Sequence, residues 1–236
     1  MRNVLFVADD LGMSDSVNAA IFHAHLHGAL DGAALMMGQP ATEAAVARAR
    51  DLSSLEIGWH LHLVDSRPCT VDRWPWGRSP ALAGFALGFS RRMRALVRDE
   101  IRAQWDAFCA TGLRCRFISG HHHLHVHPFV RTVLAETLPS DFDGWIRWGE
   151  PRFFEARASK LLYRLLHGLF QAPEYWRFPV STTLWGLDRI EAMNAAEIAA
   201  VLPSLGEGLH EFMFHPRCLE RDADTECLVA LRGARA

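Results

Sequence analysis

The sequence predicts an α/β protein built as a closed or nearly closed β/α barrel. Short apolar runs alternate with helical patterns along the chain of 236 residues. This alternation is typical of parallel strands joined by right-handed crossovers. Six or seven such units in a chain of this length favour a barrel over an open sheet, within one domain, 1–236. In such barrels the reactive residues lie at the carboxyl ends of the strands.

Apolar runs and cap residues define the elements expected in the first half. A strand over Val4–Ala8 precedes a helix over Asp15–His27, for which Ser14 or Asp15 is a plausible cap. Period-two and helical patterns then predict strands at Ala33–Met37 and Leu55–Leu63 and helices at Thr42–Arg50 and Arg91–Ala110.

The second half continues the same order. A short apolar run over Arg116–Ser119 predicts a strand, and a helix is expected to start near Phe129. Gly144–Trp148 is a candidate fifth strand. A helix over Ala192–Leu202 and a final strand over Leu209–Phe214 complete the pattern.

Two stretches fit this scheme poorly, and we expect insertions at the barrel mouth over residues 66–90 and 151–178. The first is rich in Trp and Phe, which suit sugar faces and the lipid–water boundary. The second contains a predicted helix, Phe153–Phe170, whose leucine stripe is interrupted by positive charges at Arg157, Lys160 and Arg164. That helix fits peripheral docking on a membrane, or packing on the barrel or across a dimer interface.

Composition excludes several classes of protein. The formal net charge is −2 and no basic stripe with interleaved aromatics is present, so no nucleic-acid partner is expected. Met1–Asn3 leads directly into a strand and no apolar run reaches membrane-spanning length, so we expect neither a signal peptide nor a transmembrane helix. The five cysteines show no C-x-x-C spacing. They indicate reduced thiols in a cytoplasmic protein.

A histidine run follows the strand that ends at Gly120. Residues 121–129 hold five of the thirteen histidines. Alternate residues of an extended segment point the same way, so the run would offer His121, His123, His125 and His127 on one side. Imidazole is the commonest neutral metal ligand, which favours a metal site over a loop of solvated histidines.

Adjacent carboxylates end the first strand. Asp9 and Asp10 repel each other unless a cation or proton lies between them. On an extended strand they would point to opposite sides, so one could bind a metal while the other handles protons. The alternative is a plain Asp-Asp turn before Gly12.

Two further strands place polar groups on one face. Gly58, His60 and His62 alternate toward the expected barrel axis. In the last strand, Glu211 shares a face with His215 at the mouth. A buried carboxylate needs a partner, and Glu211 could keep a proton on His215 near neutral pH.

One acidic and two imidazole ligands from three strands would leave coordination positions open. This layout is typical of a catalytic metal site, since structural sites are closed by four protein ligands. It favours hydrolysis of an unactivated carbonyl, where a metal polarises the oxygen and acidifies water. Rival interpretations are another metal-dependent amidohydrolase or phosphoesterase on a β/α barrel, and a metal- or carbohydrate-binding protein without catalysis.

Four segments together resemble the YdjC-like carbohydrate deacetylases, which include the chitooligosaccharide deacetylases. Asp9–Ser14 is similar to the family's A-D-D-F-G-L-S opening, and Gly58–Leu63 to its G-x-H-L-x-L strand. His121–Pro128 is similar to the D-S-H-x-H-x-H-x-x-P segment, and Glu211–Pro216 to the E-x-M-x-H-P strand. In one departure, Ser119-Gly120 stands where the family usually has Asp-Ser, which leaves the expected neighbouring carboxylate absent.

The resemblance implies a distorted TIM-like barrel of about seven strands, related to the polysaccharide-deacetylase type and often dimeric. It implies hydrolysis of an N-acetyl group from a sugar, with a divalent metal on Asp10, His60 and His121. Asp9 then matches the general base and His215 the general acid. Substrate contacts or support of the metal ligands are assigned to His62, His123, His125, Glu211 and Arg147.

The metal and the substrate stay open at this point. The resemblance implies Mg²⁺, whereas two imidazole ligands favour Zn²⁺. The chain also looks like a branch linked to hopanoid synthesis, which implies an N-acetylglucosaminyl glycolipid at the inner face of the membrane in place of a soluble oligosaccharide.

Overall fold

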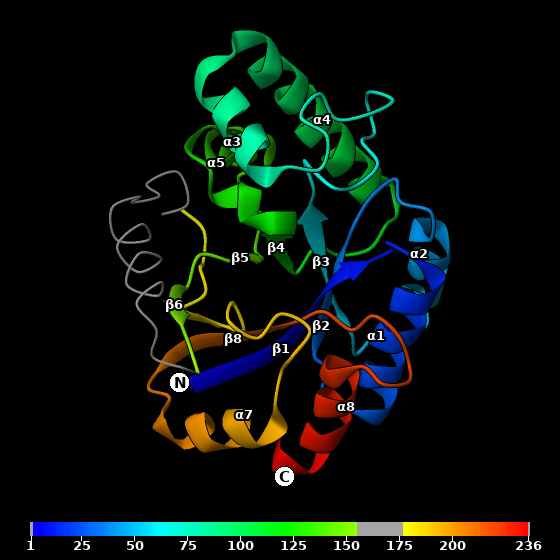
Figure 1. Ribbon diagram of the computed structural model, residues 1–236, viewed down its shortest axis with the longest axis vertical. Coiled ribbons are helices and arrows are strands. Elements are labelled where there is room, and N and C mark those ends of the chain that lie inside the picture. The colour runs from blue at the N-terminus through cyan, green and yellow to red at the C-terminus, as the bar shows by residue number, and fades with distance from the viewer. Residues whose placement is uncertain (1, 155–176, 236) are drawn as a thin grey trace.

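The computed structural model describes residues 2–154 and 177–235. Its framework is one sheet whose strands pair in parallel in the order β5-β4-β3-β2-β1-β8-β7-β6 (Figure 1). The strands are β1 (Arg2–Leu11), β2 (Gly32–Leu35), β3 (Glu56–Leu61), β4 (Phe117–Gly120), β5 (Trp145–Ile146), β6 (Glu150–Arg152), β7 (Thr183–Trp185) and β8 (Gly208–Phe214).

The two edges of this sheet are brought together by one extended segment. Strands β5 and β6 end the order on opposite sides, yet only residues 147–149 separate them. The backbone N–H of Trp145 donates to Arg116 of the β4 side, and that of Ile146 donates to Pro179 ahead of β7. A parallel bridge also joins Ile146 to Val180. The sheet therefore curls into a distorted barrel, and the predicted α/β barrel-like fold is confirmed.

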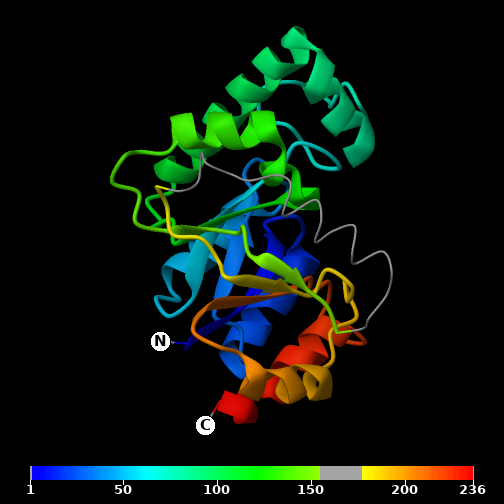
Figure 2. The ribbon, with the colours of Figure 1, turned by 90° about the vertical axis from the view of Figure 1, so that its left-hand side faces the viewer.

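Helices cover the barrel on its flank and at both ends. They are α1 (Asp15–His27), α2 (Thr42–Arg50), α3 (Pro80–Phe89), α4 (Arg91–Ala110), α5 (Pro128–Thr137), α7 (Ala195–Val201) and α8 (Ala223–Ala230), with short 3₁₀ turns η1 (His121–Val126), η3 (Leu202–Ser204) and η4 (Leu231–Arg235). The bounds of α1, α2 and α4 match the predicted ones. Helices α3, α4 and α5 lie on the side of the barrel formed by β3, β4 and β5, and α7 and α8 lie on the side formed by β1 and β8 (Figures 1 and 2).

The first predicted insertion holds helix α3, which the sequence analysis missed. Its tryptophans also differ from expectation. The rings of Trp74 and Trp76 stack 5.5 Å apart, and both side chains are buried. Their indole N–H groups donate to Ser66 Oγ and to the carbonyl of Leu63. These two rings therefore anchor the insertion and are not available to stack on a sugar or to enter a lipid boundary.

The second predicted insertion falls mainly outside the described residues. The expected helix Phe153–Phe170, with its leucine stripe and its charges at Arg157, Lys160 and Arg164, lies there except for its first two residues. In the described ranges, no helix combines the length and hydropathy needed to cross a membrane.

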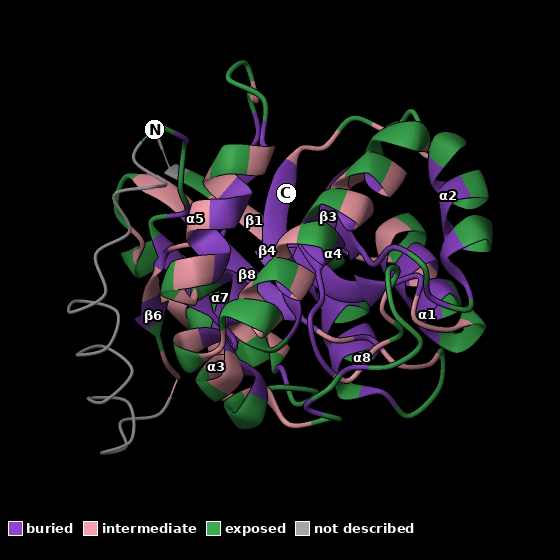
Figure 3. Cartoon of the chain, turned by 90° about the horizontal axis from the view of Figure 1, so that it is seen from above, coloured by how far each residue is buried: buried purple, intermediate pink, exposed green. Residues whose placement is uncertain are grey.

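Buried strands fill the centre of the molecule and exposed helix faces surround them (Figure 3). On the barrel interior, Phe117 stacks on Trp145 with ring centroids 4.9 Å apart. A Cβ atom at Gly58 of β3 would lie 2.4 Å from the Phe117 ring. Gly58 therefore makes room for this aromatic pair, one layer below the residues at the carboxyl end of β3.

Gly58→Ala should lower the free energy of unfolding by about 1–3 kcal/mol, because the added methyl group overpacks the Phe117 ring. Gly84→Ala in α3 is the matched control, since a Cβ atom there meets nothing within 4 Å. It should be neutral or stabilising by up to about 1 kcal/mol. Urea unfolding of both variants checks this, and equal effects would contradict the packing role of Gly58.

Candidate active site

Both carboxylates at the end of β1 enter one site, contrary to the expectation that they point to opposite sides. The pairing of β1 with β2 is irregular between Ala8 and Leu11, and Asp10 adopts φ of +67°. This local break in the alternation turns the Asp10 side chain back toward Asp9. His60 Nδ1 lies 3.7 Å from Asp9 Oδ1, and His60 Nε2 lies 3.4 Å from Asp10 Oδ1.

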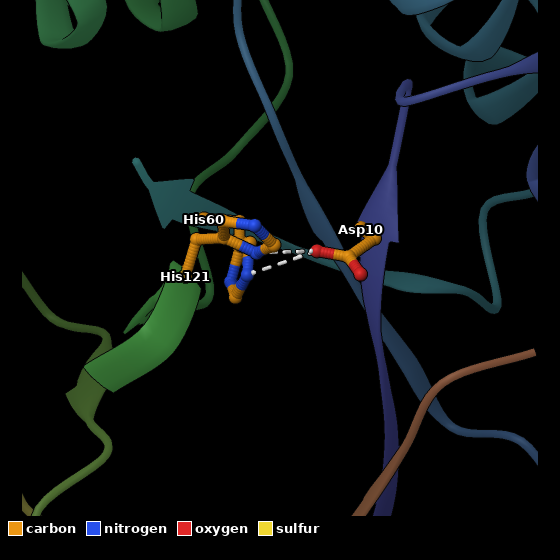
Figure 4. A group of neighbouring side chains, drawn as sticks. All are labelled: Asp10, His60 and His121. Atoms are coloured by element: carbon orange, nitrogen blue, oxygen red, sulfur yellow. Dashed lines mark ion pairs between the residues drawn. The ribbon is translucent and has the colours of Figure 1, made fainter. Parts of the chain in front are cut away.

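Asp10, His60 and His121 meet at the carboxyl ends of three strands (Figure 4). Asp10 Oδ1 lies 2.9 Å from His121 Nδ1, and one ligand atom from each residue falls within 4.8 Å of the others. All three side chains are at least nine-tenths buried. Burial opposes ionisation of Asp10, but the imidazoles of His121 and His60 hold its pKa well below the ordinary range.

This cluster fits a divalent metal ion. Asp10 Oδ1 faces the two imidazoles without a well-formed hydrogen bond, and His121 Nε2 is buried with no hydrogen-bond partner among the described residues, which is costly unless a cation or water satisfies these atoms. His60 Nδ1 lies 2.7 Å from Ser119 Oγ, which leaves Nε2 toward Asp10. One carboxylate and two imidazoles are ligands that transition metals accept readily. A left-handed backbone at Asp10 is also a typical feature of functional sites.

Arg147 links two buried carboxylates beneath the cluster. Its guanidinium contacts Asp9 through Nη1 at 2.5 Å and Nη2 at 2.9 Å, and its Nε donates to Glu211 Oε1 at 2.7 Å. Burial opposes the charge on Asp9, yet Arg147 holds the pKa of Asp9 below its ordinary value. Burial raises the pKa of Glu211 to about 6, with Arg147 opposing. Asp9 is therefore an ionised carboxylate with a fixed orientation.

His215 follows β8 and faces Asp9, with Nε2 3.8 Å from Asp9 Oδ2. The expected pairing of His215 with Glu211 is not seen, since the side-chain partner of Glu211 is Arg147. Burial lowers the pKa of His215, and the carboxylates of Asp9 and Asp10 oppose that shift. The Asp9 carboxylate is therefore the main group near His215 that favours protonation of its imidazole.

The histidine run does not form the extended strand expected from its spacing. Residues 121–126 form the 3₁₀ turn η1, with φ of +51° at His122 and +55° at His123, so the side chains fan out. His121 reaches Asp10, His122 is exposed, and His127 caps α5 by accepting from the N–H of Phe129. The reason is local. Proline at position 128 starts α5, and the chain must turn between β4 and that helix.

The remaining predicted histidines support the site from its sides. His125 is buried, and its Nε2 lies 2.9 Å from the carbonyl of Arg147. A Cβ atom at Gly120 would lie 2.6 Å from His125 Nδ1, so glycine there allows this packing. His62 is fully buried with Nε2 2.8 Å from the carbonyl of Met37. His62 is thus directed away from the carboxylates.

Two residues near the site escaped the sequence analysis. Arg217 donates from Nη1 to Asp10 Oδ2 at 2.9 Å and so orients the outer oxygen of that carboxylate. Asp224 accepts from the backbone N–H of His215 at 2.6 Å. Arg217 could have been found as a cation two residues beyond His215, at the mouth of an acidic site. Nothing in the sequence around Asp224 signals its role.

Asp65, His121 and His122 form another group close enough to hold a cation. Asp65 is already paired with Arg78, however, and His122 is exposed. The Asp10 cluster is the better metal site because its ligands are buried and two of their atoms are unsatisfied.

A cavity of about 730 Å³ opens beside the site. His123, His125 and Arg147 line it on the side of the carboxylates. Apolar side chains form most of the rest, among them Leu124, Val126, Trp148, Pro151, Leu184 and Leu187. A substrate held over the Asp10 cluster could thus place an apolar group here.

Comparison with protein families identifies the relationship. The model of the YdjC-like protein family matches residues 3–231. The chain belongs to this family. That match confirms the resemblance inferred from the four sequence segments.

Named relatives of this YdjC-like chain include carbohydrate deacetylases. That of Vibrio vulnificus strain CMCP6 is 36% identical over 135 residues, which cover 56% of this chain and 54% of the relative. That of Brevibacillus brevis is 34% identical over 136 residues, which cover 55% and 52%. The matched part thus spans about half the length of these curated relatives.

A solved structure shows the same fold. A putative cellobiose-phosphate cleavage protein from Enterococcus faecalis V583 superposes with a TM-score of 0.70 at 19% identity. The superposition covers 99% of this chain and 93% of that one. It supports the barrel architecture.

His125 should make the metal-free YdjC-like chain sensitive to acid. Burial lowers the pKa of His125 from 6.5 to about 3. Between these values the unfolded chain binds a proton that the folded chain does not, so this contribution to stability is present above pH 6.5 and is lost as the pH falls. The slope is about 1.4 kcal/mol per pH unit. Urea unfolding from pH 7 to pH 5 with chelator should show a smaller slope for His125→Gln. An unchanged slope would contradict a buried neutral imidazole.

Proposed function

We propose that this YdjC-like protein removes the acetyl group from an N-acetylated sugar by hydrolysis. The observation that supports this best is the meeting of Asp10, His60 and His121 beside Asp9 and His215. A pure binding protein would need no proton acceptor and donor next to a metal cluster. The names of the matched relatives favour a carbohydrate substrate.

Asp10, His60 and His121 would hold one divalent cation. When bound, the cation would polarise the acetamide carbonyl and lower the pKa of a nearby water. The ligand types favour Zn²⁺ or another transition metal, whereas the family resemblance favours Mg²⁺. Arg217 and Ser119 would fix the orientation of Asp10 and His60. Ser119 does so through a neutral hydroxyl in place of the carboxylate expected in the family.

Asp9 and His215 would move the protons. Asp9 is ionised and aligned by Arg147, so it can accept a proton from the attacking water. The amine is a poor leaving group until it is protonated, and His215 would give that proton. Because Asp9 faces His215, protonation of Asp9 removes a negative charge that favours the imidazolium form, and a protonated His215 would then be a stronger acid toward the amine. Glu211 holds the far side of Arg147.

The substrate is proposed to carry an apolar aglycone, as an N-acetylglucosaminyl hopanoid or a related glycolipid would. The apolar cavity beside His123 and His125 supports this, because burial of an apolar group against its walls is favourable, whereas the hydroxyl groups of a free oligosaccharide would lose their hydration there. Contact with a membrane follows from the same idea. The homodimer stays a prediction.

Asp10→Asn, His60→Ala and His121→Ala should each lose the bound metal, because each removes one ligand of a three-residue site. Elemental analysis after reconstitution with Zn²⁺ or Mg²⁺ measures this, alongside circular dichroism to establish folding. His27→Ala, an exposed histidine of α1, is the control and should bind normally. Full occupancy in any of the three variants would remove that residue from the site.

Asp9→Asn should retain the metal and lose turnover by about 10²–10⁴-fold, as expected for a general base. His215→Ala should behave likewise and should also lose the basic limb of the pH–rate profile. Acetate release from N-acetylglucosamine substrates, with and without chelator, gives both values. If the profile of His215→Ala were unchanged, the acid would be another group, with His125 next in line. Activity that resists chelation would argue against the metal.

A further inference from the structure

Helix α3 presents large apolar side chains to solvent. None of the ten residues Pro80–Phe89 has a polar side chain. Leu82 is 58% exposed, Phe85 66% and Phe89 79%. These positions lie on one side of the helix, and the rings of Phe85 and Phe89 contact each other with centroids 4.9 Å apart. We call Leu82, Phe85 and Phe89 the α3 face.

Hydrogen bonds hold α3 at both ends, so the exposure of Leu82, Phe85 and Phe89 follows from the fold. Ser79 Oγ accepts from the N–H of Leu82 at the start. At the other end, the guanidinium of Arg94 donates to the carbonyls of Leu87 and Gly88. The opposite side of α3 is buried through Ala83 and Leu87. The α3 face therefore stays directed outward.

Positive charge predominates in the stretch of chain that contains α3. Residues 73–98 include six arginines and neither Asp nor Glu, although the chain as a whole has a net charge of −2. Arg91 and Arg92 begin α4, one residue beyond the end of α3, and are exposed, and Arg78 lies just before α3. Arg78 pairs with Asp65, and Arg98 with Glu136 further along α4. Apolar side chains flanked by exposed arginines match the two parts of an anionic bilayer, its acyl boundary and its headgroups.

The α3 face also adjoins the candidate site. Pro80 and Ala81, in the first turn of α3, line the same cavity as His123 and His125. Both ribbon views place α3 on the side of the barrel at which α4 and α5 lie (Figures 1 and 2). A surface that received α3 would thus lie next to that cavity.

We propose that the α3 face docks this protein on the surface of an anionic lipid bilayer. Leu82, Phe85 and Phe89 enter the boundary between headgroups and acyl chains, while Arg91 and Arg92 lie among the headgroups. This docking does not depend on the deacetylase reaction. It deepens that function by placing the cavity where a substrate with an apolar aglycone is found.

Co-sedimentation of the whole protein with vesicles tests the docking. Vesicles of phosphatidylcholine alone are compared with vesicles containing phosphatidylglycerol, at low and high salt. Phe85→Ser/Phe89→Ser should reduce partitioning by about 10-fold or more. Arg91→Gln/Arg92→Gln should remove the preference for anionic vesicles and the dependence on salt.

Matched control variants change the same residue types elsewhere. Ile190→Ser/Leu219→Ser alters exposed apolar residues, and Arg48→Gln/Arg221→Gln removes two exposed arginines. Both should bind vesicles like the wild type, and circular dichroism establishes that all variants fold. Absence of binding by the wild type, or equal binding by Phe85→Ser/Phe89→Ser, would overturn the proposal. Sedimentation velocity tests the other occupant of this surface. If the wild type were a dimer that bound no vesicles, and Phe85→Ser/Phe89→Ser were a monomer, the α3 face would be a subunit interface instead.

Because acetate release from a soluble substrate is measured separately, a failure of the docking is distinguishable from a failure of the reaction. A variant with an altered α3 face should deacetylate a soluble N-acetylglucosamine substrate at the wild-type rate. Loss of vesicle binding together with full soluble activity would therefore support the docking role alone.

Discussion

The ion pairs of Arg147 with Asp9 and Glu211 determine how this site is built. Three charges lie out of water inside the barrel, an arrangement that is stable only because each carboxylate oxygen that Arg147 reaches has a matched donor. Strand β1 supplies one carboxylate, β8 the other, and the segment that joins β5 to β6 supplies the cation. These ion pairs thus link the segment that closes the barrel to Asp9, which lies beside the candidate metal ligands. The orientation of Asp9 therefore depends on closure of the barrel.

Much of the fold was predictable because periodicity and caps reflect local physics. Helices α1, α2 and α4 have the bounds that the sequence predicts. For α1 and α4 the signals are local, since Ser14 and Ser90 cap their first turns, and Gly28 and Gly112 follow their last turns. Helix α3 was missed because a helix without polar side chains has no amphipathic pattern to detect. Strands β6 and β7 were missed because three residues carry too little periodicity.

The site was predictable by residue type and less so by geometry. The predicted strand ends indicated that Asp10, His60 and His121 lie close together, and the structure brings these three residues together. Alternation failed at Asp10 and in the histidine run, because positive φ values at Asp10, His122 and His123 break the period of two. The partner of Glu211 was also misjudged. The pairing of Glu211 with Arg147, 64 residues away in sequence, leaves no trace in the periodicity of β8 or of the segment that joins β5 to β6.

The order of the strands also constrains how the chain can fold. Strand β1 pairs with β8, so β1 lacks one neighbour until residues 208–214 have been synthesised. Asp9 and Arg147 are separated by 138 residues, and contacts of such long range form late because the entropy of closing the loop must be overcome first. An incomplete chain therefore exposes an open sheet edge and an unpaired carboxylate. Nascent chains of this protein are expected to need protection from aggregation until β8 emerges.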